Sequence, residues 1–308
     1  MEAVKRLVNR MLPSVNTFTE RFGFQIVPAH YYSEVPSPRF LRTQTFWRTP
    51  WSMESVRGTA TEPQLRFVRD LCAPYADHLT DLRDYDAACA SNGEIGYGPI
   101  EAQLLYAFIR AKKPRRIIQV GCGVSTALIL RAATDEGGGY KPDLVCVEPY
   151  PTTMLRDLAA KGAIRLIPEM AQVVDLKTLT TLDDGDLFFV DSTHTIKPGS
   201  EVLRVIYEVL PRLPVGAWVH FHDICFPCDF NPAILQGDIW YWRETALLLS
   251  FLTMNPAYEI AASMAMLQLR EQPGLRAIFP CYQPSRMDGV LYAEPKRHFP
   301  SSIFLRRV

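Results

Sequence analysis

The stretch that decides the fold is Arg116–Thr126, which reads RIIQVGCGVST. Its first five residues are largely apolar and β-branched, which is typical of a buried strand. Gly121-Cys122-Gly123 then predicts a tight turn, because glycine takes up the required backbone angles without steric cost. A helix is predicted over Ser125–Ala133, and the free N–H groups at its start can bind a ligand. The stretch therefore predicts a strand–turn–helix unit that holds a cofactor.

Strands and helices alternate after this unit. Apolar runs predict four more strands, at Leu144–Val147, Ile164–Ile167, Leu187–Val190 and Ala217–Phe221. Helical patterns lie between them, at Thr152–Lys161 and Ser200–Leu210. Repeated units of this kind form a parallel sheet with helices on both faces, and ligands bind at the carboxyl ends of its strands. Tyr258–Leu269 and Gly289–Glu294 are predicted as two further strands, so the fold class is α/β and Rossmann-like.

Three regions are predicted along the chain. Residues 1–61 form an N-terminal extension, helical at Met1–Val15 and then rich in proline and aromatic residues, which acts as a lid or a dimerisation segment. Residues 62–294 form the cofactor-binding domain, with helical patterns at Glu62–Ala90 and Ile100–Ala111 before the first strand. Residues 295–308 are predicted to be a C-terminal tail. A homo-oligomer is compatible with the extension.

Composition narrows the range of partners. The chain has 308 residues, 48% of them hydrophobic, and 33 basic residues balance 33 acidic ones. This balance predicts a small-molecule substrate and gives no electrostatic reason to expect nucleic acid or an anionic membrane as a partner. No membrane span is predicted. The seven cysteines are scattered, which suits a reducing cytoplasm, and Met1–Val15 lacks the apolar run of a signal peptide. Cys225 and Cys228 form a lone CxxC, predicted to be structural because further zinc ligands at matching spacing are missing.

An acidic residue follows the second strand at the predicted ligand edge. Glu148 stands 25 residues beyond Gly123. A carboxylate at this place can accept hydrogen bonds from both hydroxyls of a ribose. The turn lacks the third glycine of the dinucleotide fingerprint, which weakens the case for a nicotinamide cofactor. Turn, acid and strand–helix order together predict a nucleoside-containing cofactor.

Four ordered motifs resemble those of a group of bacterial class I methyltransferases that use S-adenosylmethionine (SAM). They are Ile117–Thr126 (IIQVGCGVST), Val147–Pro151 (VEPYP), Asp186–Val202 (DLFFVDSTHTIKPGSEV) and Leu210–Pro227 (LPRLPVGAWVHFHDICFP). The resemblance implies the methyltransferase sheet, in which an antiparallel pair follows five parallel units. It also implies that Gly121 and Gly123 border the methionine part of SAM and that Glu148 binds the ribose.

The same resemblance assigns further cofactor contacts. Ser125, Thr126 and Asp191 fall within the matching motifs. Gln119 stands where the family has glutamate, at a position that helps to hold the methionine amino group. A glutamine carbonyl can still accept a hydrogen bond there, although the charge attraction is lost. Cys225 replaces an aromatic residue beside the HDI motif, which alters the predicted acceptor pocket.

Polar residues follow the fourth and fifth strands. Asp191 and His194 leave the fourth strand, and His222 and Asp223 close the fifth. Strand alternation predicts that His220 and His222 share one face and that Asp223 points to the other, and His220 is interpreted as a core residue. In one interpretation His194 or His222 is a general base for an acceptor hydroxyl, with Asp191 as its partner. In the other, Asp191, His222 and Asp223 hold a divalent ion: Mg²⁺ if carboxylates dominate, and Mn²⁺, Fe²⁺ or Zn²⁺ if histidine does.

These observations predict a methyltransferase that acts on a hydroxyl oxygen of a small molecule. Two alternatives stay open at this point. The same fold and site can serve a metal-dependent oxidation or cyclisation without methyl transfer. A catalytically silent binding protein is the other alternative, suggested by Gln119 and disfavoured by Glu148, Asp191 and the HxHD motif.

Overall fold

The computed structural model describes residues 2–29, 31–135, 139–230, 241–284 and 299–308. The chain divides into two compact units, residues 1–46 and residues 47–308. This division lies before the boundary at residues 61 and 62 that the sequence suggested. Residues 47–61 therefore belong to the larger unit.

The first unit is mostly helical. It contains α1 (Glu2–Thr19), the 3₁₀ turn η1 (Glu20–Phe22) and α2 (Pro38–Thr43). The Ser37 side chain caps α2 by accepting a hydrogen bond from the Phe40 N–H at 3.1 Å, and Pro38 occupies the first helical position. Tyr31 and Tyr32 are exposed, and their rings lie 4.0 Å apart. The predicted N-terminal helix is present.

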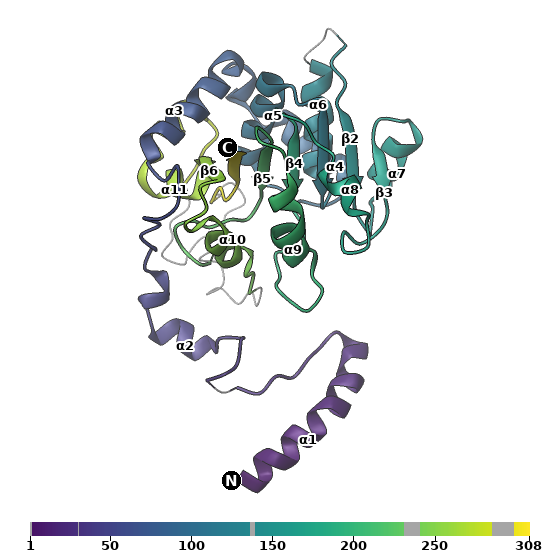
Figure 1. Cartoon of the computed structure of the whole chain (residues 1–308), viewed down its shortest axis with the longest axis vertical. Helices are drawn as coiled ribbons and strands as arrows, with labels where there is room; N and C mark the ends of the chain where they lie inside the picture. The colour runs from purple at the N-terminus through teal and green to yellow at the C-terminus, as the bar shows by residue number, and fades with distance from the viewer. Residues whose placement is uncertain (1, 30, 136–138, 231–240, 285–298) are drawn as a thin grey trace. The chain divides into compact units, whose positions relative to one another are not determined.

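A seven-stranded sheet forms the centre of the larger unit (Figure 1). Its strands lie in the order β3-β2-β1-β4-β5-β7-β6. The first five are parallel and β7 is antiparallel to both of its neighbours. Their bounds are β1 Arg116–Val120, β2 Asp143–Val147, β3 Arg165–Ile167, β4 Leu187–Val190, β5 Trp218–Phe221, β6 Tyr258–Ser263 and β7 Ile303–Arg307. The predicted α/β fold class, with parallel strands and a C-terminal antiparallel pair, is confirmed.

The last two strands differ from their predicted positions. The final strand is Ile303–Arg307, inside the segment 295–308 that was predicted to be a tail. That prediction is wrong, because Ile303, Phe304 and Leu305 are completely buried between β5 and β6. The predicted strand Gly289–Glu294 lies outside the described residues. The strand β6 ends at Ser263, before the predicted end at Leu269, because the helix-forming residues that follow it form α11 (Met264–Arg270).

Two hydrophobic cores lie on opposite faces of the sheet. Alternate residues of a strand enter different cores: Ile117 and Phe189 belong to one, and Ile118 and Phe188 to the other. The first core packs against α3 (Thr61–Cys72), α4 (Arg83–Asn92), α5 (Pro99–Lys112), α6 (Val124–Asp135), α7 (Thr153–Ala160), α11 and α12 (Gln272–Ile278). The second packs against α8 (Leu176–Thr180), the π-helical turn η5 (Val205–Val209) and α10 (Glu244–Leu252). Helices therefore cover both faces, as predicted.

Short helical turns complete the larger unit. They are η2 (Phe46–Arg48), η3 (Ala73–Tyr75), η4 (His78–Thr80), α9 (Glu201–Arg204) and η6 (Leu210–Arg212). The helix predicted over Glu62–Ala90 is thus two helices, α3 and α4, joined by η3 and η4. Pro74 falls in η3, where it removes a backbone N–H and ends the first helix. This break brings the C-terminal end of α4 towards the ligand edge of the sheet.

Candidate active site

The glycine turn joins β1 to α6 at the carboxyl edge of the sheet. Gly121 has a φ of +83°, and a Cβ atom there would lie 1.7 Å from the backbone oxygen of Asp191. The Gly121 N–H donates to the Val147 carbonyl at 3.0 Å, and the Asp191 N–H donates to the Val120 carbonyl at 2.8 Å. The ends of β1, β2 and β4 are therefore fixed against one another at this turn. Only glycine fits at this position.

Glu148 lies at the end of β2, opposite the glycine turn. Its Oε2 accepts a hydrogen bond from the Cys122 N–H at 3.2 Å, and its Oε1 accepts one from the Tyr150 N–H at 2.9 Å. Each carboxylate oxygen has a second lone pair. The side chain borders the cleft, so these lone pairs are available to a ligand. The structure thus places Glu148 where the sequence predicted an acceptor for two hydroxyls.

Gln119 has a different environment from the one its position in the motif suggested. It is completely buried, its Oε1 accepts a hydrogen bond from the Thr126 hydroxyl at 2.9 Å, and its Nε2 donates to the Ser125 hydroxyl at 2.7 Å. Thr126 also accepts the Gly123 N–H at 3.2 Å. Both ends of the Gln119 amide are therefore engaged with the first turn of α6. In this arrangement Gln119 braces the turn, and Ser125 is the member of the group that borders the cleft.

A cleft of about 1620 Å³ lies at the carboxyl edge of the sheet. A site for one small ligand usually occupies roughly 300–1,000 Å³, so this cleft can hold a cofactor together with a second molecule. Its walls include the glycine turn, Glu148, the loop 92–100 and residues that follow β4 and β5. The predicted residues Gly123, Ser125, Glu148, Asp191, His194, His222 and Asp223 all line this one cleft.

Asn92, the last residue of α4, was not recognised from the sequence. Its side-chain nitrogen lies 3.1 Å from the place where a Cβ on Gly123 would be. Its Oδ1 accepts a hydrogen bond from the Thr152 hydroxyl at 3.1 Å, and Thr152 caps α7. Asn92 therefore connects α4 to the elements that follow β1 and β2. A glycine after a helical asparagine signals only the end of a helix, so no pattern in the sequence placed Asn92 at the cofactor turn.

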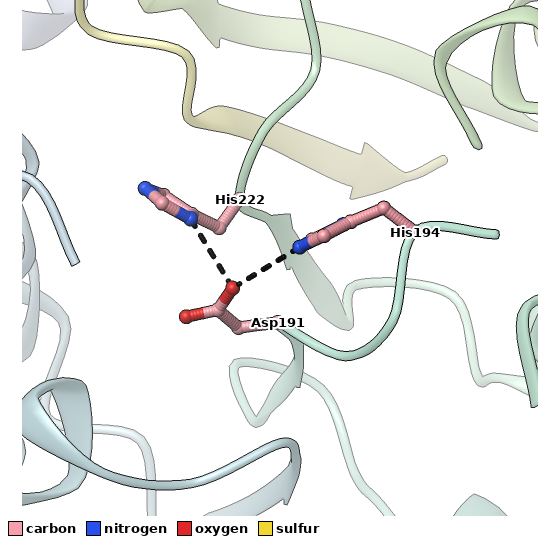
Figure 2. Close-up of side chains that lie close together, drawn as sticks. All are labelled: Asp191, His194 and His222. Atoms are coloured by element: carbon pink, nitrogen blue, oxygen red, sulfur yellow. Dashed lines mark hydrogen bonds and ion pairs between the residues drawn. The ribbon is translucent and has the colours of Figure 1, made fainter. Parts of the chain in front are cut away.

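Asp191 and two histidines form a buried cluster beyond β4 and β5. The Nδ1 of His222 lies 3.1 Å from the Oδ1 of Asp191, and the Nε2 of His194 lies 3.5 Å from the same oxygen. Figure 2 shows both imidazole rings converging on this carboxylate from different segments. The ring of Tyr97 lies 4.6 Å from the ring of His222. The structure thus brings together the three residues that were predicted to be catalytic.

A second carboxylate holds the other side of His194. The Nδ1 of His194 lies 2.7 Å from the Oε2 of Glu244, which is completely buried at the start of α10. The His194 carbonyl accepts the N–H groups of Arg243 and Glu244 at 3.0 and 3.2 Å, so it caps that helix. His194 has a φ of 57°, and its ring packs 4.9 Å from that of Trp242. Glu244 therefore fixes the orientation of His194.

Asp223 joins the cluster, although strand alternation predicted that it would point away. The strand β5 ends at Phe221, and Asp223 has a φ of 56°, so the alternation no longer applies. Its Oδ2 lies 3.6 Å from the Nδ1 of His222 and 3.7 Å from the Nε2 of His194. Its Oδ1 accepts a hydrogen bond from the Ser301 hydroxyl at 2.8 Å. The alternation argument was wrong, and Asp223 faces both histidines.

The cluster is a network of ion pairs. Burial by itself would lower the pKa of His222, but the charges of Asp223 and Asp191 outweigh it and raise the pKa to about 9. Burial likewise opposes the protonation of His194, whose pKa is raised well above its usual value by hydrogen bonds to Asp191 and Glu244. Burial would raise the pKa of Asp191, yet the two histidines hold that pKa well below its usual range. Asp191 is therefore ionised between two protonated imidazoles.

The remaining candidate residues, His220, Cys225 and Cys228, are buried in the protein. His220 is completely buried, its Nε2 lies 2.9 Å from the Tyr97 hydroxyl, and burial lowers its pKa to about 3. It is a core residue, as predicted. Cys225 and Cys228 are buried free thiols, and neither belongs to a metal-compatible group within the described part of the chain. Among the described helices, none has the length and apolarity needed to cross a membrane.

Comparison with known proteins supports the resemblance seen in the motifs. Residues 118–224 match the family model described as a methyltransferase domain. The matched segment contains the glycine turn, Glu148 and the whole of the Asp191 cluster, so the resemblance to methyltransferases is confirmed. A protein of Archaeoglobus fulgidus, described as uncharacterized, is 27% identical over 185 residues, which is 58% of this chain and 80% of that protein.

Two solved structures are among those to which the chain is similar. One is a methyltransferase from Podospora anserina with bound S-adenosylhomocysteine, with 18% identity, a TM-score of 0.41, and coverage of 62% of this chain and 88% of the other. The other is the O-methyltransferase TomG from Streptomyces achromogenes in complex with SAM, with 15% identity, a TM-score of 0.46, and coverage of 78% and 96%.

Proposed function

We propose that the protein transfers a methyl group from SAM to a hydroxyl oxygen of a small molecule. One observation carries the proposal. The cofactor turn and the reactive cluster are in direct contact, because a Cβ on Gly121 would lie 1.7 Å from the backbone oxygen of Asp191. A cofactor seated on the turn therefore has its reacting end next to the cluster. A methyl transfer needs this proximity of donor and acceptor.

The residues at the ends of β1 and β2 fit SAM. The backbone of the turn approaches the cleft closely, and the three atoms nearest to a Cβ on Gly123 all belong to the Asn92 side chain. Glu148 offers carboxylate lone pairs on the same side of the cleft, suited to the two hydroxyls of a ribose. In the proposed complex Gly121 and Gly123 border the methionine part, Glu148 binds the ribose and Ser125 contacts the cofactor directly. Gln119 and Thr126 hold Ser125 in place.

The cluster beyond β4 and β5 fits an acceptor hydroxyl. Asp191, His194, His222 and Asp223 line the cleft and can hydrogen-bond to an oxygen that enters it. The methyl group passes from the sulfonium of SAM to the acceptor oxygen, the hydroxyl proton leaves to water in the cleft, and S-adenosylhomocysteine is released. Holding the oxygen in line with the sulfonium is the main contribution of these side chains. Cytoplasmic location and a homo-oligomeric state stay predictions from the sequence.

Calorimetry of SAM binding tests the cofactor half of the proposal. Glu148→Gln removes one acceptor and the charge, and hydrogen bonds to charged groups contribute about 1.5–3 kcal/mol. We expect SAM affinity to fall about 10- to 100-fold in this variant. Glu169→Gln makes the same chemical change at an exposed position outside the cleft, and its affinity should equal that of the wild type. A wild-type protein that binds neither SAM nor S-adenosylhomocysteine would refute the proposal.

The transfer itself is measured by the release of S-adenosylhomocysteine from SAM. Phenols, catechols and sugars provide a panel of hydroxyl acceptors, and primary amines provide the comparison. Turnover with hydroxyl compounds that is lost in Asp191→Asn supports the assignment. Turnover confined to amines would contradict the choice of oxygen but leave the cofactor assignment intact.

A further inference from the structure

We propose that Asp191, His194 and His222 bind a divalent first-row transition-metal ion of the Mn²⁺, Fe²⁺ or Zn²⁺ type in preference to Mg²⁺. This inference deepens the proposed function, since it concerns the same cleft, and it rests on that function only for the role of the ion in catalysis. The binding of the ion itself can be measured without SAM.

The first argument is the spacing of the donor atoms. One ligand atom from each of the three residues lies within 4.8 Å of the others. The Asp191 oxygen is 3.1 Å from the Nδ1 of His222 and 3.5 Å from the Nε2 of His194. Two ligands that each lie about 2.1 Å from one ion are separated by about 3.0 Å at an octahedral angle and about 3.4 Å at a tetrahedral angle. The observed separations therefore suit ligands of a single ion, as the convergence in Figure 2 illustrates.

The second argument is the environment of the outer ring nitrogens. Histidines that ligate metals usually donate their other N–H to a carboxylate, which fixes the tautomer and the ring orientation. The Nδ1 of His194 has this partner in Glu244, at 2.7 Å. The Nε2 of His222 faces the buried Glu101 at 3.9 Å, while Glu101 itself accepts the Ser301 N–H at 2.7 Å. The His194 imidazole thus has a hydrogen-bonded carboxylate behind it, the His222 imidazole has the longer contact with Glu101, and both rings direct a nitrogen at Asp191.

The chemistry of the donors selects the class of ion. Mg²⁺ prefers oxygen ligands, whereas imidazole nitrogen suits Mn²⁺, Fe²⁺ and Zn²⁺. The sequence alone suggested Asp191, His222 and Asp223 as ligands, with two carboxylates. The structure groups His194 with Asp191 and His222, while one Asp223 oxygen accepts a hydrogen bond from the Ser301 hydroxyl. Two imidazole nitrogens, which lose their protons when the ion binds, and one carboxylate oxygen then face the ion.

The site is open on one side. All three residues line the cleft, so a bound ion would be within reach of an acceptor oxygen. A divalent ion at this place would lower the pKa of that oxygen and orient it. The role of the chain is to hold the ion with Asp191, His194 and His222 and to keep His194 aligned through Glu244.

A second group with metal-compatible spacing offers an internal comparison. His78, Asp84 and Asp135 also lie within 4.8 Å of one another. The Nε of Arg131 lies 3.1 Å from both aspartates, so a guanidinium already occupies the position of a cation there. We therefore expect the Asp191 group to bind the ion and the His78 group to bind none.

The test is metal binding to the full chain after treatment with a chelator. Calorimetry with MnCl₂, ZnSO₄ and MgCl₂ gives the affinities, and CoCl₂ gives a visible absorption spectrum that reports nitrogen ligands. We expect one ion per chain and at least a 10-fold preference for Mn²⁺ over Mg²⁺. His194→Gln should lower Mn²⁺ affinity more than 100-fold, and Glu244→Gln, which acts through His194, about 10- to 100-fold. His78→Gln should leave the affinity for each of these ions unchanged.

Several outcomes would overturn the proposal. They are the absence of Mn²⁺ and Zn²⁺ binding to the wild type, tighter binding of Mg²⁺ than of Mn²⁺, or a Co²⁺ spectrum unchanged by His194→Gln. Circular dichroism of each variant shows whether it folds. If His194→Gln does not fold, the Mn²⁺ affinity of Glu244→Gln decides the test. SAM binding is measured on the same samples. Metal binding without SAM binding refutes the proposed function alone, and SAM binding without metal binding refutes this inference alone.

Discussion

Replacement of Gly121 by alanine should disrupt the cofactor site and destabilise the fold. The added Cβ would lie 1.7 Å from the Asp191 carbonyl oxygen, whereas non-bonded atoms pack favourably at about 3.5–4 Å, so the backbone must move by more than about 1 Å. Overpacking typically costs about 1–3 kcal/mol, and a left-handed φ costs a residue with a side chain roughly 1–2 kcal/mol more. We expect Gly121→Ala to lower the free energy of unfolding by about 2–5 kcal/mol.

Gly185→Ala is the matched control for this change. Gly185 has nearly the same φ, +85° against +83°, but a Cβ there meets no atom within 4 Å. The control should therefore lose only the conformational contribution, roughly 1–2 kcal/mol. Urea unfolding followed by circular dichroism gives both values, and calorimetry gives SAM affinity, which should fall more than 100-fold in Gly121→Ala alone. Equal losses of stability in the two variants, or unchanged SAM affinity in Gly121→Ala, would refute the close contact between turn and cluster.

Three further substitutions test neighbouring parts of the molecule. Gln119→Leu removes both amide hydrogen bonds and should lower the free energy of unfolding by about 1–3 kcal/mol in urea titrations; a stabilised variant would contradict the bracing role. Asn92→Ala should weaken SAM binding in calorimetry by about 3- to 10-fold, equivalent to one net hydrogen bond, and wild-type affinity would exclude Asn92 from the cofactor site. Phe304→Ala creates a cavity in the middle of β7 and should cost about 3–5 kcal/mol by the same unfolding assay, whereas a tail residue would cost close to nothing.

The parallel part of the fold could be predicted because its signals are local. Each strand from β1 to β5 is a short, largely apolar run, and the residue that follows each run is a glycine, a proline or a polar residue. The strand β7 offers only three apolar residues, Ile303, Phe304 and Leu305, and lies outside the alternation of strands and helices. This segment forms a strand because it pairs with β5 on one side and with β6 on the other. Such pairing depends on the arrangement of the whole sheet, so the local sequence pattern could not reveal it.

The site could be predicted in its residue types but only in part in its geometry. The sequence correctly indicated that residues after β4 and β5 would gather at one edge, because this follows from the topology of a parallel sheet. It failed for Asp223, since a single left-handed residue turned the carboxylate back towards His222. It did not indicate the two amide hydrogen bonds of Gln119 to Ser125 and Thr126, because they depend on rotamers that spacing alone does not determine.

Glu244 marks the limit of the sequence argument most sharply. It lies 50 residues from His194 in the chain, and nothing near it in the sequence resembles a catalytic motif. The contact exists because the His194 carbonyl caps α10, and this cap places the first residue of the helix beside the imidazole. The backbone cap on α10 therefore positions the Glu244 carboxylate, and this carboxylate orients the His194 side chain. If the cluster holds a metal ion, the metal affinity of His194 depends on this helix cap as well as on the ligands themselves.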